Sequence, residues 1–222
     1  MKVVVVVPAF NEATKIRSVV EGIQSVCPDI VVVDDGSTDR TADCLERSGA
    51  IVLRHLVNRG QGAALQTGIE CAVRLDADIV VTFDADGQHD PSDIPALVGP
   101  IERGECDVAL GSRFLGSSIG MPVARRCLLR AAVMLTGLVS RIQVSDVHNG
   151  LRAFSRRAAA ELKITQDQMA HASEILEVIH TKRWNYVEVP VTIRYTQYSL
   201  AKGQKLSDAI RIGIQILMDK LR

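Results

Sequence analysis

The chain has 222 residues, of which 47% are hydrophobic, and it carries 26 basic and 26 acidic side chains. This is enough to bury one large core, or one domain with a small C-terminal extension. The balanced charge and the 4% aromatic content argue against a nucleic-acid-binding protein, which usually shows a basic excess or aromatic stacking platforms.

The cysteines indicate a reduced, cytoplasmic protein. There are five, an odd number, and no two of them form a C-x-x-C pair, which argues against a disulfide framework and a structural zinc site. The opening run Val3–Val7 is too short for a signal-peptide core. Because no apolar run reaches the ~18 residues of a membrane span, we do not expect this chain to cross a bilayer.

In the first half of the chain, short apolar runs rich in β-branched residues alternate with helical patterns. Such runs are typical of strands buried in a parallel sheet. The alternation predicts βαβ units, and therefore an α/β fold with a mostly parallel, doubly wound sheet. The expected strands are Val3–Val7, Ile30–Val33, Ile51–Leu53, Ile79–Phe83 and Val108–Leu110, and the expected helices are Glu12–Val26, Thr38–Ser48, Gly62–Arg74 and Pro91–Arg103.

After residue 115 the pattern changes. We expect helices over Met121–Arg141 and Ala172–Thr181, a loop leading into a strand over Asp146–Phe154, and an extended segment over Tyr186–Tyr195. Leu206–Arg222 has an apolar stripe flanked by basic residues, a pattern that suits a helix at a membrane interface. Packing of this helix onto the domain is the alternative explanation.

Polar residues follow four of the expected strands. Ligands of doubly wound sheets bind at the carboxyl ends of the strands, and neighbouring strands lie only ~5 Å apart. The polar segments therefore predict one ligand-binding rim, made of residues Pro8–Glu12, Asp34–Asp39, Asp84–Asp86 and Gly111–Phe114.

Asp84 and Asp86 are the most informative pair at this rim. In an extended segment, side chains two residues apart point to the same side. Two carboxylates aimed at one point repel each other unless a cation lies between them. Hard oxygen ligands suit Mg²⁺ or Mn²⁺, ions that usually bridge carboxylates to substrate phosphates. An Asp-rich turn without a ligand is the alternative.

Two other acidic residues suggest a nucleoside site. Asp35 can accept hydrogen bonds from ribose hydroxyls or a base edge, although a capping turn, with Ser37 or Thr38 capping the next helix, explains most of its segment. Glu12 can face a base or ribose, or only stabilise a helix start. The glycine-rich run Asn58–Gly62 fits neither the dinucleotide pattern nor the P-loop pattern.

Five segments in this order resemble the family-2 glycosyltransferases of the GT-A fold, and most of all the dolichyl- and polyprenyl-phosphate sugar transferases. They are Pro8–Glu12, Val33–Asp39, Asn58–Gly68, Phe83–Pro91 and Gly111–Phe114. The resemblance implies a Rossmann-like, mostly parallel twisted sheet with helices on both faces and a small C-terminal acceptor-side extension. It further implies a catalytic domain over residues 1–200, with a nucleotide-sugar half (1–115) and an acceptor half (116–200), followed by a terminal helix (201–222).

The resemblance also implies roles for individual residues. The metal ligands would be Asp84, Asp86 and Gln88, and the catalytic residues Asp86, Arg113 and Asp146. Arg113, Arg126 and Arg130 would meet the acceptor phosphate, although a solvated helix face also explains the last two. The nucleotide-sugar would contact Pro8, Ala9, Asn11, Glu12, Asp35, Gly36, Asp84, Ala85, Arg194 and Lys202. The segment Arg194–Ser199 lacks the early glycine of the family's R-x-x-G-x-S-K element, so its basic residue is not fixed.

The implied reaction is an inverting, metal-dependent transfer of a sugar from a UDP- or GDP-linked donor. No paired carboxylate base is evident, and a phosphate monoester, with a second pKa of ~6, needs none. We therefore expect a polyprenyl phosphate acceptor, with Asp146 acting as base or orienting the acceptor. The chain would be peripheral at the inner face of a membrane, attached to a separate membrane-anchoring protein, or truncated. The alternatives are transfer to a saccharide hydroxyl, a haloacid-dehalogenase-like phosphatase and a non-catalytic nucleotide-sugar-binding module.

Overall fold

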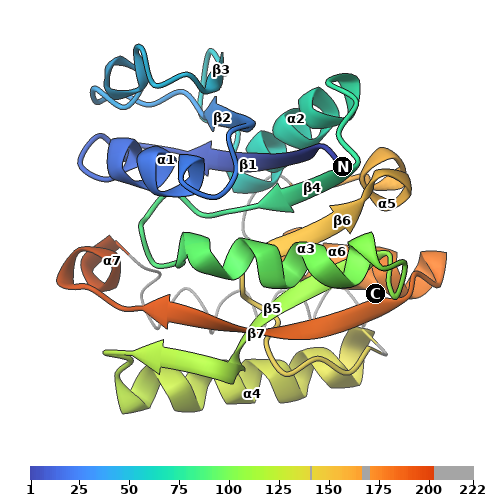
Figure 1. Cartoon of the computed structure of the whole chain (residues 1–222). Helices are drawn as coiled ribbons and strands as arrows, with labels where there is room; N and C mark the ends of the chain where they lie inside the picture. The colour runs from blue at the N-terminus through green and yellow to red at the C-terminus, as the bar shows by residue number, and fades with distance from the viewer. Residues whose placement is uncertain (141, 167–170, 203–222) are drawn as a thin grey trace.

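A seven-stranded sheet organises the molecule, with the strand order β3-β2-β1-β4-β6-β5-β7 (Figure 1). The computed structural model describes residues 1–140, 142–166 and 171–202. Its strands are β1 (Val3–Ala9), β2 (Ile30–Asp34), β3 (Ile51–Arg54), β4 (Ile79–Thr82), β5 (Val108–Ile119), β6 (Arg152–Ser155) and β7 (Tyr186–Arg194). Its α-helices are α1 (Ile16–Gln24), α2 (Gln61–Arg74), α3 (Ile94–Glu102), α4 (Val123–Ser140), α5 (Arg156–Glu161), α6 (His171–Lys182) and α7 (Gln197–Lys202).

The predicted α/β fold with a mostly parallel sheet is confirmed. β1 pairs in parallel with β2 and β4, and β5 pairs in parallel with β7. The exception is β6, which lies antiparallel between β4 and β5. This return strand joins the N-terminal half of the sheet to the β5–β7 pair.

The valine run of β1 shows why the sheet is buried on both faces. Val5 and Val7 pack into one core cluster together with residues of α1 and α3. Val4 and Val6 pack into a second cluster together with residues of α2, α5 and α6. Successive side chains of a strand point to opposite faces, so a continuous valine run fills both layers of the core.

The predicted helix over Thr38–Ser48 is wrong, because only a 3-10 turn, η1 (Asp43–Leu45), forms there. The backbone amides of Thr38 and Asp39 donate to the side chain of Asn11, and the carboxylate of Asp39 accepts from the amide and hydroxyl of Thr41. Such bonds between side chains and backbone compete with helix formation. The predicted helix start at Glu12 is also too early, since α1 begins at Ile16.

The predicted end of the fifth strand at Leu110 is wrong as well. β5 continues to Ile119, paired with β7 as far as Arg194, with an irregularity between Ser112 and Ser117. The helices α5 and α7 were not predicted from the sequence. The predicted helix Leu206–Arg222 lies outside the described residues. Within those residues, no helix is both long and apolar enough to span a membrane.

Gly68 fixes how closely α2 approaches the sheet. A Cβ atom added to it would overlap Val6 Cγ1 and would lie 3.2 Å from Val33 Cγ2. Both valines are fully buried, so neither can move without disturbing the second core cluster. We predict that Gly68→Ala lowers the free energy of unfolding by about 1–3 kcal/mol, the usual cost of overpacking, despite alanine's better helix propensity.

The matched control is Gly22→Ala in α1, where the added Cβ would lie 3.2 Å from a ring carbon of Pro91. That variant should unfold at the same urea concentration as the wild type or higher, because alanine favours the helix by about 1 kcal/mol. Urea unfolding monitored by circular dichroism measures both. Equal stability of the two variants would contradict the packing argument.

Candidate active site

The carboxyl ends of β1, β2 and β4 meet at one edge of the sheet and carry the acidic residues predicted for the rim. The amide of Asp35 donates to the carbonyl of Ala9 at 2.8 Å, which joins the ends of β1 and β2. The amide of Phe83, just after β4, donates to the carbonyl of Val6 at 2.9 Å. The backbone therefore sets the spacing of the three loops before any ligand is present.

Asp84 is held from both sides. Its Oδ1 accepts a hydrogen bond from Gln61 Nε2 at 2.9 Å, and its Oδ2 lies 3.0 Å from Nε2 of His89. Gly150 lies directly against this carboxylate, and a Cβ atom at that position would overlap the carboxylate oxygens. The Asp84 side chain is 30% exposed, so a ligand can still reach it.

The two aspartates have opposite pKa shifts. Burial opposes the ionisation of Asp84, but the hydrogen bond and charge of His89, with the charges of His171 and Arg152, outweigh it, so the pKa of Asp84 lies below its ordinary value. Burial and the charge of Asp84 raise the pKa of Asp86 to about 6. The second carboxylate is thus costly to ionise beside the first.

This arrangement fits a divalent cation. A cation bound between the carboxylates would relieve the repulsion that raises the pKa of Asp86. In the described part of the chain, no group of three or more His, Cys, Asp or Glu side chains could hold a metal ion. The pair therefore suits an ion such as Mg²⁺ or Mn²⁺ that takes its other ligands from water and substrate phosphates.

Gln88, predicted as a third ligand, lies in the same loop. Its backbone amide donates to Asp86 Oδ1, and its carbonyl accepts from the amide of Arg194.

Asp35 organises a neighbouring loop. Its Oδ1 contacts His55 Nδ1 at 2.7 Å and accepts from the amide of Arg59 at 3.0 Å. Its Oδ2 accepts from Asn58 Nδ2 at 2.9 Å and from the amide of Gly60 at 2.7 Å. A carboxylate offers about four acceptor positions, so these partners use its capacity. In this conformation Asp35 orders the loop that opens α2, instead of presenting a vacant acceptor to a ribose.

The loop after β1 joins residues that are far apart in the sequence. Asn11 has a φ of 54°, and its side chain accepts from Thr38 and Asp39. Gly36 has a φ of 68°, and a Cβ atom there would lie 2.6 Å from the carbonyl carbon of Val57, so only glycine fits without strain. The buried Glu12 accepts a hydrogen bond from the hydroxyl of Tyr198 in α7 at 2.8 Å.

Arg113 and Asp146, both predicted as catalytic, form a buried ion pair. Arg113 Nε donates to Asp146 Oδ2 at 2.6 Å, and the Arg113 amide donates to the same oxygen at 3.0 Å. Arg113 Nη1 also donates to the hydroxyl of Tyr195 at 2.5 Å. The guanidinium is thereby aligned by two partners, and Asp146 is the group that aligns it.

The remaining predicted residues have other contacts. Arg126 is exposed and donates to Ser118 Oγ at 3.3 Å, and Arg130 lies over the ring of Phe114 at 5.7 Å. Arg194, at the end of β7, donates to Asp90 at 3.1 Å. Pro8 and Ala9 belong to β1, and Ala85 is buried between the two aspartates. Lys202 ends α7, and its side chain is not among those described.

Three residues that hold the site together were not predicted from the sequence: His89, Gln61 and Arg152. Arg152 is 4% exposed and donates to the carbonyl oxygens of Val147 and Asn149. Burial lowers its pKa to about 10, and the charges of Asp84 and Asp146 oppose the decrease. Arg152 and His89 could have been predicted, because Arg152 follows the Asp146 loop and His89 follows Asp84 closely in the sequence. No sequence pattern near Gln61 indicates its contact with Asp84.

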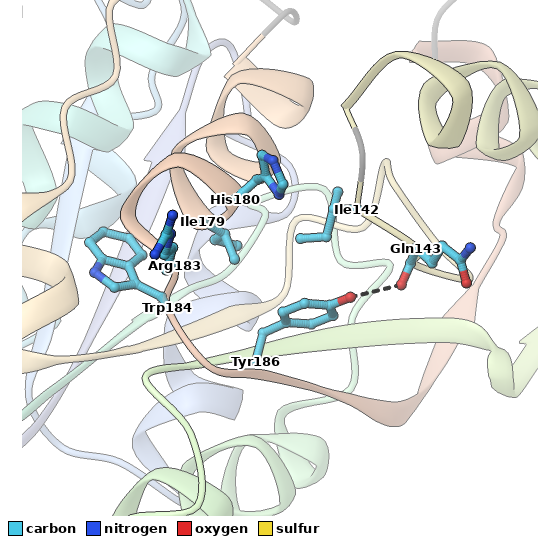
Figure 2. Close-up of a pocket in the computed structure, with 7 residues that line it drawn as sticks. All are labelled: Ile142, Gln143, Ile179, His180, Arg183, Trp184 and Tyr186. Carbon is cyan, nitrogen blue, oxygen red and sulfur yellow. Dashed lines mark hydrogen bonds between the residues drawn. The ribbon is translucent and has the colours of Figure 1, made fainter.

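A separate hollow of about 590 Å³ lies at the other end of β7 (Figure 2). Its wall includes Tyr186, at the start of β7, whose hydroxyl donates to the carbonyl of Gln143 at 3.0 Å. The other residues around it are Ile142, Ile179, His180, Arg183 and Trp184. None of the predicted site residues lines this hollow, so it is distinct from the rim.

Comparison with known proteins bears on what this rim does. The family model for "Glycosyl transferase family 2" matches residues 4–163. UDP-N-acetylglucosamine–dolichyl-phosphate N-acetylglucosaminyltransferase of Methanococcus voltae is 33% identical, over 97% of this chain and 95% of that protein. Polyprenol monophosphomannose synthase of Mycolicibacterium smegmatis is 26% identical, over 100% of this chain and 90% of that protein.

Among solved structures, glucosyl-3-phosphoglycerate synthase of Mycobacterium tuberculosis in complex with Mn²⁺ and UDP-glucose is similar, with a TM-score of 0.71 and 25% identity. The match covers 97% of this chain and 76% of that chain. Together these likenesses confirm the predicted GT-A type of α/β fold and the family resemblance.

The raised pKa of Asp86 makes a prediction about stability. In the folded, metal-free protein this pKa is about 6, above the ordinary 3.8, so the folded state favours the protonated form. The resulting stabilisation is complete below pH 4 and is lost as the pH rises through 6. We predict that Asp86→Asn, which cannot ionise, gains about 2–3 kcal/mol of unfolding free energy relative to the wild type between pH 4 and pH 8, because each pKa unit corresponds to about 1.4 kcal/mol.

Urea unfolding of both proteins in the presence of a chelator, at pH 4, 6 and 8, measures this difference. Added Mn²⁺ should reverse the order at pH 8, because the ion binds the wild-type carboxylates and stabilises the native state. A difference that does not change with pH would contradict the proposed repulsion.

Proposed function

This chain belongs to glycosyl transferase family 2 and is a glycosyltransferase, and from that premise we propose that it transfers a sugar from a nucleotide-diphospho-sugar to a polyprenyl phosphate. The observation that carries the proposal is the loop from Asp146 to Gly150. Asp146 at its start binds Arg113, and Gly150 at its end abuts Asp84. A candidate cation site and an aligned arginine thus flank one short loop.

Asp84 and Asp86 would hold Mg²⁺ or Mn²⁺ together with the donor. The bound ion would supply charge neutralisation at the diphosphate leaving group. Other residues of the chain prepare the site for the donor. Gln61 and His89 fix the carboxylate of Asp84, and Asp35 orders the loop that starts α2. The likeness to a structure with bound Mn²⁺ and UDP-glucose supports this arrangement.

A phosphate acceptor explains the basic residues better than a sugar hydroxyl does. A phosphate monoester with a second pKa of ~6 is already anionic at neutral pH, so no side chain has to remove a proton. Arg113 has its Nε on Asp146 and its Nη1 on Tyr195. Its Nη2 has no hydrogen-bond partner among the described residues and can bind an anion. Asp146 then acts by orienting Arg113 instead of as a base. Relatives named for transfer to dolichyl and polyprenol phosphates support this acceptor.

In the proposed reaction, a phosphate oxygen of the acceptor attacks the anomeric carbon as the bond to the nucleoside diphosphate breaks. The attack comes from the side opposite the leaving group, so the configuration inverts. The products are the polyprenyl-phosphate sugar and the nucleoside diphosphate, and no net proton transfer to the protein is required.

A lipid acceptor requires the site to face a membrane, and one surface suits that role. Between Asp107 and Asp146 the chain has no acidic residue, and its only charged side chains are five arginines. In the same stretch three apolar side chains are strongly exposed: Leu115 (53%), Ile119 (50%) and Val123 (77%). Exposed apolar groups beside arginines favour an anionic bilayer surface. The exposed Arg126 and Arg130 of α4 lie beside this stretch of β5, at Ser118 and Phe114.

The transfer itself is tested with labelled UDP- and GDP-sugars, Mn²⁺ and a short-chain polyprenyl phosphate. We expect a polyprenyl-phosphate sugar with inverted anomeric configuration, determined by NMR, and no product after chelation. Asp86→Ala should lower kcat/KM at least about 100-fold, because the cation contributes several kcal/mol to the transition state.

The control is Asp43→Ala, whose carboxylate is 62% exposed and pairs only with the neighbouring Arg40 in the described structure. It should retain wild-type activity. A free saccharide in place of the lipid phosphate tests the alternative acceptor. Efficient transfer to the saccharide and none to the phosphate would contradict the proposal.

The membrane surface is tested by replacing its apolar side chains. We predict that the triple variant Leu115→Ser, Ile119→Ser and Val123→Ser binds vesicles of phosphatidylcholine and phosphatidylglycerol at least about 10-fold more weakly, because each exposed side chain loses the transfer free energy of burial in the bilayer. Co-sedimentation at low and high salt measures the binding.

Val26→Ser combined with Leu56→Ser is the matched control, since both side chains are exposed elsewhere on the protein. The control should bind vesicles as the wild type does. Both variants should glycosylate the short-chain acceptor in solution at the wild-type rate. If the triple variant binds vesicles normally, another surface meets the membrane.

A further inference from the structure

His89 is a buried residue whose contacts join the candidate cation site to the C-terminal part of the sheet. Its side chain is only 3% exposed, and Nε2 lies 3.0 Å from Asp84 Oδ2. The ring lies edge-on to Phe83, with 5.2 Å between the ring centroids. Because a carboxylate only accepts hydrogen bonds, Nε2 must be the donor in this contact.

The environment of the other ring nitrogen, Nδ1, indicates that a histidine at this position lowers the stability of the fold. Nδ1 is buried and has no hydrogen-bond partner among the residues that the structure describes. A buried polar atom without a partner costs stability, and a phenyl ring would fill the same space without that cost. The gain that offsets it must come from the hydrogen bond that the His89 side chain makes within the described residues, and that bond goes to Asp84.

The backbone of the same loop is fixed against β7. His89 forms an antiparallel bridge with Ile193, and the carbonyl of Gln88 accepts from the amide of Arg194 at 2.8 Å. The imidazole therefore projects from a backbone that cannot easily shift relative to the sheet. Gln61, from the start of α2, holds the opposite oxygen of Asp84. Two fixed donors on two different oxygens determine how the carboxylate is rotated.

We propose that His89 is a positioning residue for Asp84. It holds the carboxylate in the rotation that directs the remaining lone pairs toward the divalent cation, and it links this orientation to β7. This inference rests on the proposed function, because it takes Asp84 to be a ligand of that cation. Partners that orient metal ligands typically affect metal affinity by 10–100-fold.

The test compares His89→Phe with His89→Gln. The phenyl ring retains the apolar bulk but removes the donor, whereas the glutamine amide can donate again to Asp84. We expect His89→Phe to weaken Mn²⁺ binding by about 10–100-fold, measured on the substrate-free protein from the electron paramagnetic resonance signal of unbound Mn²⁺. His89→Gln should recover most of that loss. The melting temperature of metal-free His89→Phe should not fall below that of the wild type.

A double-mutant cycle shows whether His89 acts through Asp84. In an Asp84→Asn background, His89→Phe should cause little further loss of Mn²⁺ affinity, because the carboxylate to be oriented is already gone. His180→Phe, an exposed histidine of α6 at the distant hollow, is the control and should bind Mn²⁺ normally.

The outcomes separate this inference from the proposed function. Wild-type Mn²⁺ affinity in His89→Phe, equal losses in the Phe and Gln variants, or additive losses in the cycle would each overturn the role of His89. If Asp84→Asn itself leaves Mn²⁺ binding unchanged, both the cation site and the role of His89 are wrong. Metal binding that depends on Asp84 and His89 without sugar transfer would leave this inference standing and contradict only the proposed function.

Discussion

The repulsion between the carboxylates of Asp84 and Asp86 is the constraint around which the site is organised. Both follow a strand whose residues are buried on both faces of the sheet, and the charge of the first raises the pKa of the second. The fold does not relieve this repulsion by turning one side chain away. It stabilises one carboxylate with fixed donors and leaves the second costly to ionise, which is what a site needs if a cation is to be bound at neutral pH.

The antiparallel strand β6 explains how the two halves of the site come together. It returns between β4 and β5, and the loop that precedes it carries Asp146 at one end and Gly150 at the other. The buried Arg152, the first residue of β6, holds the carbonyl oxygens of that loop. A continuous parallel sheet would bring a crossover helix to this position, with no loop between the aspartates and Arg113. Among the seven described strands, the antiparallel β6 is therefore the one whose preceding loop brings the Asp146–Arg113 pair next to Asp84.

Much of this architecture can be predicted from the sequence, because the strands are buried on both faces and their apolar runs are unmistakable. The acidic residues could be assigned to one rim for the same reason, since parallel strands end at the same edge. The failures have a different origin. The helix predicted over Thr38–Ser48 is prevented by hydrogen bonds to Asn11, which lies 27 residues earlier in the chain than Thr38. The partners of Asp84 and Asp35 include Gln61 and His55, and no local pattern shows that such residues converge on a carboxylate.

The hydrogen bond between Tyr198 and Glu12 spans 186 positions of the chain. During synthesis on the ribosome, β1 and its loop emerge first, whereas Tyr198 emerges only when most of the domain has already been made. Contacts of such long sequence separation form late, since the intervening chain must be ordered before they can close. The contact at Glu12, in the loop after β1, thus stays open on the nascent chain until the C-terminal part arrives, so an incomplete chain lacks a finished rim even when its core has already collapsed.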